Sequence, residues 1–496
     1  MRITESTGEC YSASFLYSGG FHAQAEVDQF NQTRLVIGID DYDFSWKLKK
    51  GESFSTPEVC LTYSADGFSK LSQTLHQAIV SNLIRSCWKD RVRPILVNNW
   101  EATYFDFNKD NLIAIAKEAA ELNLDMLVLD DGWFGKRDDD FSGLGDWFVN
   151  EKKLCGTLSE LVKEVHDMGL SFGLWFEPEM ISEDSDLYRA HPDWALVIPG
   201  RQPIRSRSQL VLDMSREDVT DYLTERICDI VEKADIQYIK WDMNRSLMAA
   251  YSAKLPRDRQ GELRHRYVLG LYKVLEAVTQ RFPELLLEGC SGGGGRFDAG
   301  MLYYCPQIWC SDNTDAIERL RIQYGTSFGY PMSSVSAHVS VCPNHQNHRV
   351  TPFKTRGICA MQGTFGYELD LSKMTDEEKK MAGEQIAFFK EHGRLFQFGD
   401  YYRLTSPFEN RDYTVWEYAA QDGSEACMSV VYTDMYANAA SEIVKWKGLD
   451  PKKVYQMQLD GEDAGNFSGA ALMHAGILLP LPEQNYDAFQ IYLKAE

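Results

Sequence analysis

The chain has no apolar run of about 18 residues, the length that a membrane-spanning helix needs. Its first residues, MRITESTGECYSASF, also lack the apolar stretch of a secretory signal peptide. Both absences argue against a membrane partner and against export. We therefore expect a cytoplasmic protein.

Dense runs of Lys and Arg are missing as well. The 496 residues carry a formal net charge of −22. The phosphate backbone of a nucleic acid or an anionic membrane surface would repel such a protein. The composition thus excludes partners of these two classes and is compatible with a small, neutral substrate.

Regularly spaced cysteines are the third absence. The 11 Cys are scattered without CxxC pairs, and several, such as Cys310 and Cys359, lie in apolar stretches. A disulfide framework would show a regular pattern of spacings. Reduced, mostly buried thiols are therefore expected.

The apolar pattern divides the chain into three predicted domains. Residues 1–85 have the alternation of β-strands and end in a short helix, and residues 396–496 return to strands separated by turns. Residues 86–395 alternate strands with amphipathic helices, which predicts a (β/α)₈ TIM barrel. We expect an α/β fold in which the barrel is followed by an antiparallel β-sandwich. The eight predicted barrel strands are PILVNNW, LDMLVLDDGWF, LSFGLWFEPEM, WALVIPG, IQYIKWDMN, ELLLEGCSGG, QIWCSDN and SSVSAHVS.

Polar side chains gather at the C-terminal ends of these predicted strands, where barrel enzymes have their active sites. A barrel interior cannot hold many carboxylates without a use for them, because burying an unpaired charge is costly. The sequence therefore predicts an active site among these residues: Asn98, Asn99, Asp130, Asp131, Glu177, Glu179, Asp242, Asn244, Glu288 and Asp312.

The segment YIKWDMNR places Lys240, Asp242 and Asn244 at alternate positions of a strand end, so the three share one face. A lysine beside an aspartate keeps the carboxyl ionised, as a nucleophile requires. A structural Lys–Asp pair at the barrel rim is the alternative.

A second acidic segment, QIWCSDNTDAIERL, offers Asp312 and Asp315 after another strand. Asp315 directly precedes a helix, where an aspartate interacts favourably with the helix dipole. Asp312 is closer to the strand end and is the better candidate for an acid that faces a cavity. The residues alone leave the choice between the two open.

Further polar segments allow two interpretations. Asp130 and Asp131 can converge on sugar hydroxyls or on a metal ion, and Trp175 suits a sugar face or a hydrophobic core. A metal-dependent lyase with Asp130, Glu177 and Asp242 as ligands is the rival hypothesis.

Two other clusters carry weaker signals. CSGGGGRFD lacks the pattern of a phosphate-binding loop, so its glycines more simply allow close approach to a ligand, beside a small neutral Cys290. His338, His345 and His348 lack a standard metal spacing and are interpreted as structural or rim residues.

Together these segments resemble glycoside hydrolase family 36, the microbial α-galactosidases. The resemblance implies a retaining hydrolase that releases terminal α-galactose from oligosaccharides of the melibiose and raffinose type, without a metal or cofactor. The matching stretches keep the family's order from about residue 90 to 375: PILVNNWEATYFDFN, LDDGWFGKRDDD, GDWFVN, GLWFEPEMI, HPDWAL, VLDMSR, YIKWDMNRS, EGCSGGGGRFD, WCSDNTDAIERLRIQYG, SAHVSVCPNHQ and FGYELDLS.

Position by position, the resemblance implies that Asp242 is the nucleophile and Asp312 the acid/base. The carboxyl groups of a retaining enzyme lie roughly 5–5.5 Å apart, against roughly 6.5–9.5 Å in an inverting enzyme, and we expect the shorter separation. The substrate-binding residues that the resemblance implies are Trp100, Asp130, Asp131, Trp175, Arg207, Lys240, Asn244, Cys290, Gly292 and Gly293.

The N-terminal region departs from the family pattern. Family members carry a large N-terminal β-sandwich, and residues 1–85 resemble only its last part, a remnant with unpaired strand edges. The resemblance implies a homo-oligomer if the full-length form is present. An α-N-acetylgalactosaminidase, an α-galactosyltransferase and an inactive sugar-binding module are the alternatives to hydrolysis of galactosides.

Overall fold

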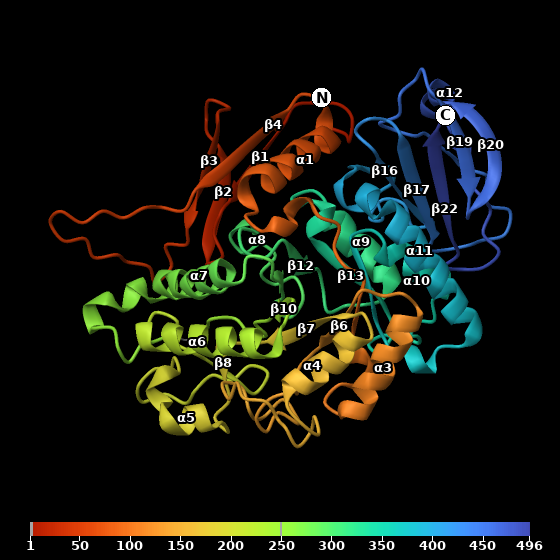
Figure 1. Ribbon diagram of the computed structural model, residues 1–496. Coiled ribbons are helices and arrows are strands. Elements are labelled where there is room, and N and C mark those ends of the chain that lie inside the picture. The colour runs from red at the N-terminus through yellow and green to blue at the C-terminus, as the bar shows by residue number, and fades with distance from the viewer. Residues whose placement is uncertain (1–2, 249) are drawn as a thin grey trace.

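A closed barrel of eight parallel strands forms the centre of the computed structural model, which describes residues 3–248 and 250–496 (Figure 1). The first two residues of the predicted N-terminal domain lie outside the described residues. The predicted (β/α)₈ barrel is thus confirmed. Its strands are β5 (Leu96–Asn98), β6 (Met126–Leu129), β7 (Ser171–Phe176), β10 (Tyr238–Trp241), β11 (Leu286–Gly289), β12 (Gln307–Trp309), β13 (Val335–Ser340) and β14 (Thr364–Glu368).

The barrel strands are buried on both faces because helices cover the outside while side chains fill the inside. All four residues of β6, MLVL, are buried. Local capping starts several of the helices: Thr157 and Glu160 form a capping box at one, and Thr375 and Glu378 at another. The main helices are α3 (Lys109–Glu121), α4 (Leu158–Asp167), α6 (Glu217–Ala234), α7 (Leu263–Arg281), α9 (Ala316–Thr326), α10 (Phe353–Ala360) and α11 (Asp376–Phe398).

One predicted barrel strand is wrong. Most of the segment WALVIPG, residues 194–200, lies in the long connection between β7 and β10, and Ala195 forms only an isolated bridge with Leu212. Trp194, Ala195 and Leu196 are buried, and Trp194 packs against Tyr222 of α6, with ring centroids 5.6 Å apart. The eighth barrel strand is β14, which pairs with β13 and β5 and closes the barrel.

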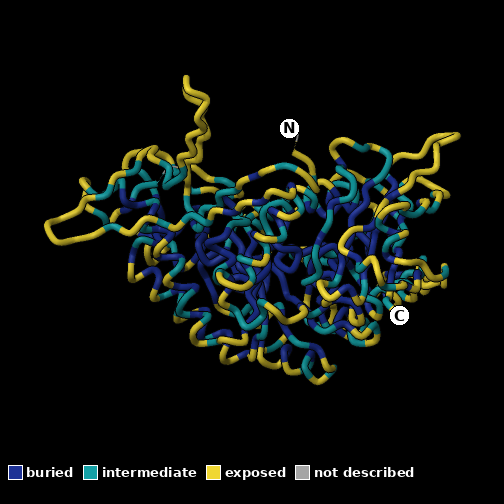
Figure 2. Tube along the Cα trace, turned by 90° about the horizontal axis from the view of Figure 1, so that it is seen from above, coloured by how far each residue is buried: buried dark blue, intermediate teal, exposed yellow. Residues whose placement is uncertain are grey.

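The N-terminal region forms two separate two-stranded sheets and a helix. β1 (Cys10–Phe15) pairs with β4 (Val59–Ser64), and β2 (Phe21–Val27) pairs with β3 (Thr33–Ile39). β2 is exposed along its whole length, as Figure 2 shows. The helix α1 (Gly67–Ala78) follows and continues into one π-helical turn over Ile79–Leu83.

The C-terminal region is an antiparallel sheet with its own hydrophobic core, as predicted. The small pair β18 (Ile443–Val444) and β21 (Ile477–Leu478) and the helix α12 (Gly469–His474) complete this region. Among the described residues, none of the helices combines the length and the apolar character needed to cross a membrane. The six strands, in spatial order, are β15 (Asp400–Arg403), β16 (Tyr413–Ala419), β17 (Glu425–Tyr432), β22 (Ala488–Ala495), β19 (Val454–Leu459) and β20 (Glu462–Ser468).

Candidate active site

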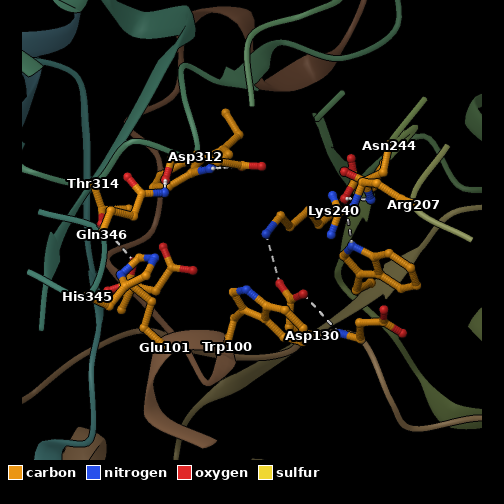
Figure 3. A pocket seen from close by; sticks show the side chains of 15 residues that line it. Trp100, Glu101, Asp130, Arg207, Lys240, Asn244, Asp312, Thr314, His345 and Gln346 are labelled. Atoms are coloured by element: carbon orange, nitrogen blue, oxygen red, sulfur yellow. Dashed lines mark hydrogen bonds and ion pairs between the residues drawn. The ribbon is translucent and has the colours of Figure 1, made fainter. Parts of the chain in front are cut away.

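A cavity of about 170 Å³ opens at the C-terminal ends of the barrel strands (Figure 3). Among the described residues, every barrel strand except β11 contributes a lining side chain, directly or through the loop that follows it. The volume is below the roughly 300–1,000 Å³ of sites for drug-sized ligands, so the cavity suits one small polar ring. Most of the predicted site residues line it: Trp100, Asp130, Asp131, Trp175, Arg207, Lys240, Asp242, Asn244 and Asp312.

Three predicted substrate-binding residues, Cys290, Gly292 and Gly293, are not among the lining residues. Gly293 has a φ of 82°, and a Cβ at this position would lie 2.4 Å from the backbone nitrogen of Asp312. Only glycine allows this close approach. The structure therefore shows the glycine loop supporting the backbone at Asp312, while its contact with a ligand stays a prediction.

The carboxylate of Asp242 is held by three N–H donors. Its Oδ2 accepts hydrogen bonds from Trp175 Nε1 at 3.2 Å and from Asn244 Nδ2 at 2.8 Å. Its Oδ1 accepts one from the backbone nitrogen of Met243 at 2.8 Å. These donors fix the direction of the carboxylate, which faces the cavity.

Lys240 does not pair with Asp242, contrary to the prediction. Its ammonium group bonds to Asp130 Oδ2 at 2.8 Å, and Asn98 Nδ2 donates to the same oxygen at 2.7 Å. Burial alone would lower the pKa of Lys240, but the acidic groups around it, with Asp130 the largest contributor, together outweigh burial, and the pKa lies well above its usual value. Figure 3 shows this pair inside the cavity, between the side of Asp312 and the side of Asn244.

Asp131 is buried beside Arg137. The guanidinium donates to both carboxylate oxygens, with Nε at 3.0 Å from Oδ1 and Nη2 at 2.8 Å from Oδ2. Burial raises the pKa of Asp131, and Arg137 acts in the opposite direction. The pair holds Asp131 at the cavity wall.

We expect Arg137→Leu to lower the free energy of unfolding by about 3–5 kcal/mol, because it leaves Asp131 as a buried charge without a partner. Urea unfolding followed by fluorescence measures this change. Arg189→Leu is the control, since Arg189 pairs with Asp184 and Asp186 at the exposed surface and should cost at most about 1 kcal/mol. Equal costs for the two variants would contradict the prediction.

Asp312 lies across the cavity from Asn244 and Arg207 (Figure 3). Trp309 Nε1 donates to its Oδ1 at 3.0 Å. Burial, with a further contribution from the charge of Asp242, raises the pKa of Asp312 to about 6. A carboxyl with this pKa can hold a proton and donate it near neutral pH.

Asp315, the competing candidate, has a structural role. Its Oδ1 accepts hydrogen bonds from the backbone nitrogens of Ile317 at 3.0 Å and Glu318 at 2.9 Å, so it caps α9. Arg349 also pairs with it. Asp312 lines the cavity and Asp315 does not.

Several lining residues were missed by the sequence reasoning. Glu101 accepts a hydrogen bond from Thr314 Oγ1 at 2.7 Å, and burial raises its pKa to about 8. Its neighbour Trp100 in NNWE was the signal that could have identified it. Glu368 ends the strand that the sequence reasoning missed. The full set of missed residues is Glu101, Trp309, Thr314, His345, Gln346 and Glu368.

The acids Glu177, Glu179 and Glu288 are buried but do not line the cavity. Glu179 pairs with Arg296, whose Nη2 lies 2.8 Å from Glu179 Oε1. Glu288 accepts a hydrogen bond from Gln307 at 2.8 Å. Glu179 and Glu288 thus belong to the packing around the barrel interior.

The metal-dependent lyase hypothesis needed Glu177 to join Asp130 and Asp242 on one ion. Instead, Glu177 Oε1 accepts from Gln209 Nε2 at 2.6 Å, outside the cavity lining. Within residues 3–248 and 250–496, no three His, Cys, Asp or Glu side chains are arranged to hold a metal ion. The proposed set of ligands is therefore wrong.

Comparison with known families covers nearly the whole chain. The N-terminal domain of glycosyl hydrolase family 36 matches residues 2–49, the Melibiase family matches residues 53–399, and the C-terminal domain of glycosyl hydrolase family 36 matches residues 413–493. The chain belongs to glycoside hydrolase family 36. The resemblance inferred from the motifs is thereby confirmed.

Individual members of family 36 are similar over the full chain. It is 54% identical over 98% of its length to the bifunctional alpha-galactosidase/sucrose kinase AgaSK of Mediterraneibacter gnavus, and 52% identical over 99% to the alpha-galactosidase AgaA of Geobacillus stearothermophilus. The crystal structure of AgaA superimposes on all of the chain with a TM-score of 0.98, and the match covers 68% of AgaA. The chain spans 51% of the length of AgaSK and 67% of the length of AgaA.

Proposed function

We propose that this chain is a retaining α-galactosidase that hydrolyses terminal α-D-galactosyl residues from oligosaccharides of the melibiose and raffinose type. The observation that carries the proposal is the pair of carboxyl groups, Asp242 and Asp312, at one cavity that suits a single sugar ring. The two come from different strand ends, and the charge of Asp242 helps Asp312 to retain a proton. A nucleophile and an acid are the two groups that a retaining glycosidase requires.

The proposed reaction has two steps. Asp312 donates its proton to the glycosidic oxygen while Asp242 attacks the anomeric carbon, so the leaving alcohol departs and a galactosyl ester forms on Asp242. Asp312, now ionised, then removes a proton from water, which attacks the same carbon and releases galactose with retained configuration. The donors Trp175 and Asn244 keep the carboxylate of Asp242 directed at the cavity throughout.

The relatives support the proposed substrate class. AgaA variants have been crystallised in complex with raffinose and with stachyose. The raffinose complex has one aspartate replaced by asparagine, and the stachyose complex has another replaced by alanine. These two positions of AgaA are separated by the same number of residues as Asp242 and Asp312.

The remaining assignments are proposals with the same basis. We assign galactose binding to the other predicted cavity residues, a homo-oligomer to the full-length form, and domain limits of 1–85, 86–395 and 396–496. All eleven cysteines of the described chain are free thiols, which supports a cytoplasmic location.

We expect the chain to hydrolyse nitrophenyl α-galactoside at the same rate with and without EDTA, because the two carboxyl groups suffice for the chemistry. Proton NMR during hydrolysis should show α-galactose before mutarotation forms the β anomer. β-Galactose as the first product would reject the retaining mechanism. Activity that EDTA removes and Mg²⁺ restores would reject catalysis by carboxyl groups alone, and galactose binding without turnover would favour the sugar-binding module.

Two alternative activities, an α-N-acetylgalactosaminidase and an α-galactosyltransferase, would use the same chemistry. The substrates consumed and the products formed distinguish them from the proposed hydrolase. If the chain hydrolyses nitrophenyl N-acetyl-α-galactosaminide faster than the galactoside, this result would favour the N-acetylgalactosaminidase. Oligosaccharide products in place of free galactose would favour the transferase. No contact in the described structure favours either over hydrolysis of galactosides.

A further inference from the structure

Glu177 lies at the end of β7, directly behind the candidate active site. It is buried and does not line the cavity. One of its oxygens, Oε1, accepts two hydrogen bonds: from the backbone nitrogen of Asn244 at 2.5 Å and from Gln209 Nε2 at 2.6 Å. The other oxygen, Oε2, has no hydrogen-bond partner within the described structure. Such a buried carboxyl needs an explanation, since burial without full pairing is unfavourable.

The first hydrogen bond leads to the nucleophile. Asn244 uses its backbone nitrogen for Glu177 and its side-chain Nδ2 for Asp242 Oδ2, which lies 2.8 Å away. Asn244 also lines the cavity. Glu177 thereby fixes the backbone of the residue that orients the proposed nucleophile.

The second hydrogen bond leads to the turn that carries Arg207. Ser206 and Gln209 form an isolated bridge across this turn, and Arg207 and Ser208 both have positive φ angles, 50° and 60°. Non-glycine residues adopt this conformation only when the surroundings hold them in it. The side chain of Gln209, bonded to Glu177, is one of the contacts that hold the turn.

A second contact supports the same turn. Arg245 Nη1 donates to the backbone oxygens of Ile204 and Gln209, each at 2.8 Å. Arg207 itself reaches the cavity on the side of Asn244, as Figure 3 shows. Two side chains thus tie the turn to the barrel: Glu177, which follows β7, and Arg245, which lies close to Asp242 in the chain.

We propose that Glu177 is a positioning residue, which fixes from behind the cavity both Asn244, the partner of the nucleophile, and the turn that presents Arg207. The inference rests on the proposed function for its kinetic consequences. Its structural part, the support of the turn, is independent of any reaction.

The charge of Glu177 is consistent with this role. Burial, with a further contribution from Asp242, raises the pKa of Glu177 to about 8. At neutral pH the group is therefore mostly an uncharged acid, which can accept two hydrogen bonds on one oxygen without placing a second negative charge behind Asp242. Glutamine has the same shape, an acceptor oxygen at the same place and no charge.

Three substitutions test the proposal in kinetic assays with nitrophenyl α-galactoside. Glu177→Gln keeps the acceptor and should retain kcat/KM within about threefold, whereas Glu177→Leu loses both hydrogen bonds and should lower it about 100-fold. Gln209→Leu loses only the bond to the turn and should raise KM about tenfold with little change in kcat. Glu177→Leu and Glu177→Gln with equal activity would overturn the proposal.

Glu417→Gln is the matched control. Glu417 is a buried glutamate of β16 whose Oε2 accepts a hydrogen bond from the backbone nitrogen of Lys447 at 2.9 Å. Burial raises its pKa well above the usual value, as it does for Glu177. We expect this control to leave kcat and KM unchanged even where thermal unfolding shifts, because a general loss of stability does not change the kinetics of the folded fraction.

A double-mutant cycle tests whether Glu177 acts through the turn. Arg207→Ala alone should raise KM, and adding Gln209→Leu to it should have little further effect, because the same contribution is already lost. If the increase in KM of the double variant equalled the product of the two single increases, this part of the proposal would be overturned. The Gln209 substitution removes one buried hydrogen bond and leaves an apolar side chain of similar size in its place, so the test does not depend on the folding of Glu177→Leu.

Hydrogen exchange read by mass spectrometry tests the support of the turn without a substrate. Peptides covering residues 198–212 should exchange faster in Gln209→Leu than in wild type, and at the wild-type rate in Glu177→Gln. Unchanged exchange in Gln209→Leu would overturn the proposal. A wild-type chain without hydrolytic activity would instead reject the proposed function, and faster exchange in Gln209→Leu would still support the positioning role.

Discussion

Replacing Asp242 with glycine is expected to lower kcat/KM for nitrophenyl α-galactoside on the order of 10⁴-fold, because the attacking group is lost while the cavity remains. The three donors that hold this carboxylate come from Trp175, Met243 and Asn244, all of which stay in place. Steady-state kinetics measures the loss. Galactose binding to the variant checks that its active site is still formed. Near-normal activity of the variant would reject Asp242 as the nucleophile.

Added azide should restore part of this activity, since the glycine leaves space for a small anion on the side from which Asp242 attacks. The azide then forms the bond to the anomeric carbon, and the product is β-galactosyl azide, identified by NMR. The control is Asp312→Gly, in which Asp242 still forms the covalent intermediate and azide replaces water, so the product is α-galactosyl azide. If Asp242→Gly instead gave the α-azide and Asp312→Gly the β-azide, the roles of nucleophile and acid/base would be reversed.

The sequence was sufficient to predict that Asp242, the proposed nucleophile, faces the cavity, because that prediction depends on local geometry. Lys240, Asp242 and Asn244 alternate at the end of β10, and all three line the cavity as the two-residue period predicts. The partner of Lys240 could not be predicted in this way. Asp130 is 110 residues away, directly after β6, and only the order of strands in the closed barrel brings the two together.

The error at the eighth barrel strand has a similar cause. WALVIPG is apolar because Trp194 packs on a helix, and apolar character alone does not distinguish this burial from that of a strand. β14, TFGYE, is short and has glycine at its centre. A Cβ at Gly366 would lie 2.9 Å from the backbone oxygen of Leu96 on β5, so close packing of strands requires the residue that makes the segment look weak as a strand.

Buried acids outside the cavity show the same limit for the candidate site. Glu177 and Asp130 follow apolar strands in the same manner, and their sequence contexts are equally compatible with a cavity position. The structure separates them because the chain bends after β7 and Glu177 bonds to Gln209 and Asn244. Tertiary contacts, which no pattern of spacing contains, thus decide which acids reach the ligand.

Replacing Asp312 with asparagine is expected to change the pH profile as well as the rate. The acid must carry its proton to donate it, and the protonated fraction falls as the pH rises through the pKa of about 6. In wild type, kcat/KM for raffinose should therefore decrease above about pH 6. Asp312→Asn should lose this decrease and lower kcat/KM about 10²- to 10⁴-fold, the usual contribution of a general acid.

The leaving group gives a second, independent measurement on the same variant. Nitrophenol departs without a proton, so Asp312→Asn should form the galactosyl enzyme from nitrophenyl α-galactoside at nearly the wild-type rate. Its hydrolysis should be slow because water lacks a base, which predicts a burst of nitrophenol followed by slow turnover. Raffinose, whose leaving oxygen needs the proton, should show no burst.

The control for Asp312 is Asp315→Asn, a carboxyl at the start of α9 outside the cavity. Loss of part of its capping should lower the free energy of unfolding by about 1 kcal/mol without removing the decrease of kcat/KM above pH 6. If the decrease persists in Asp312→Asn, the acid must be another carboxyl of the cavity. A decrease that begins only near pH 8 would point to Glu101, a lining carboxyl whose pKa burial raises to about 8.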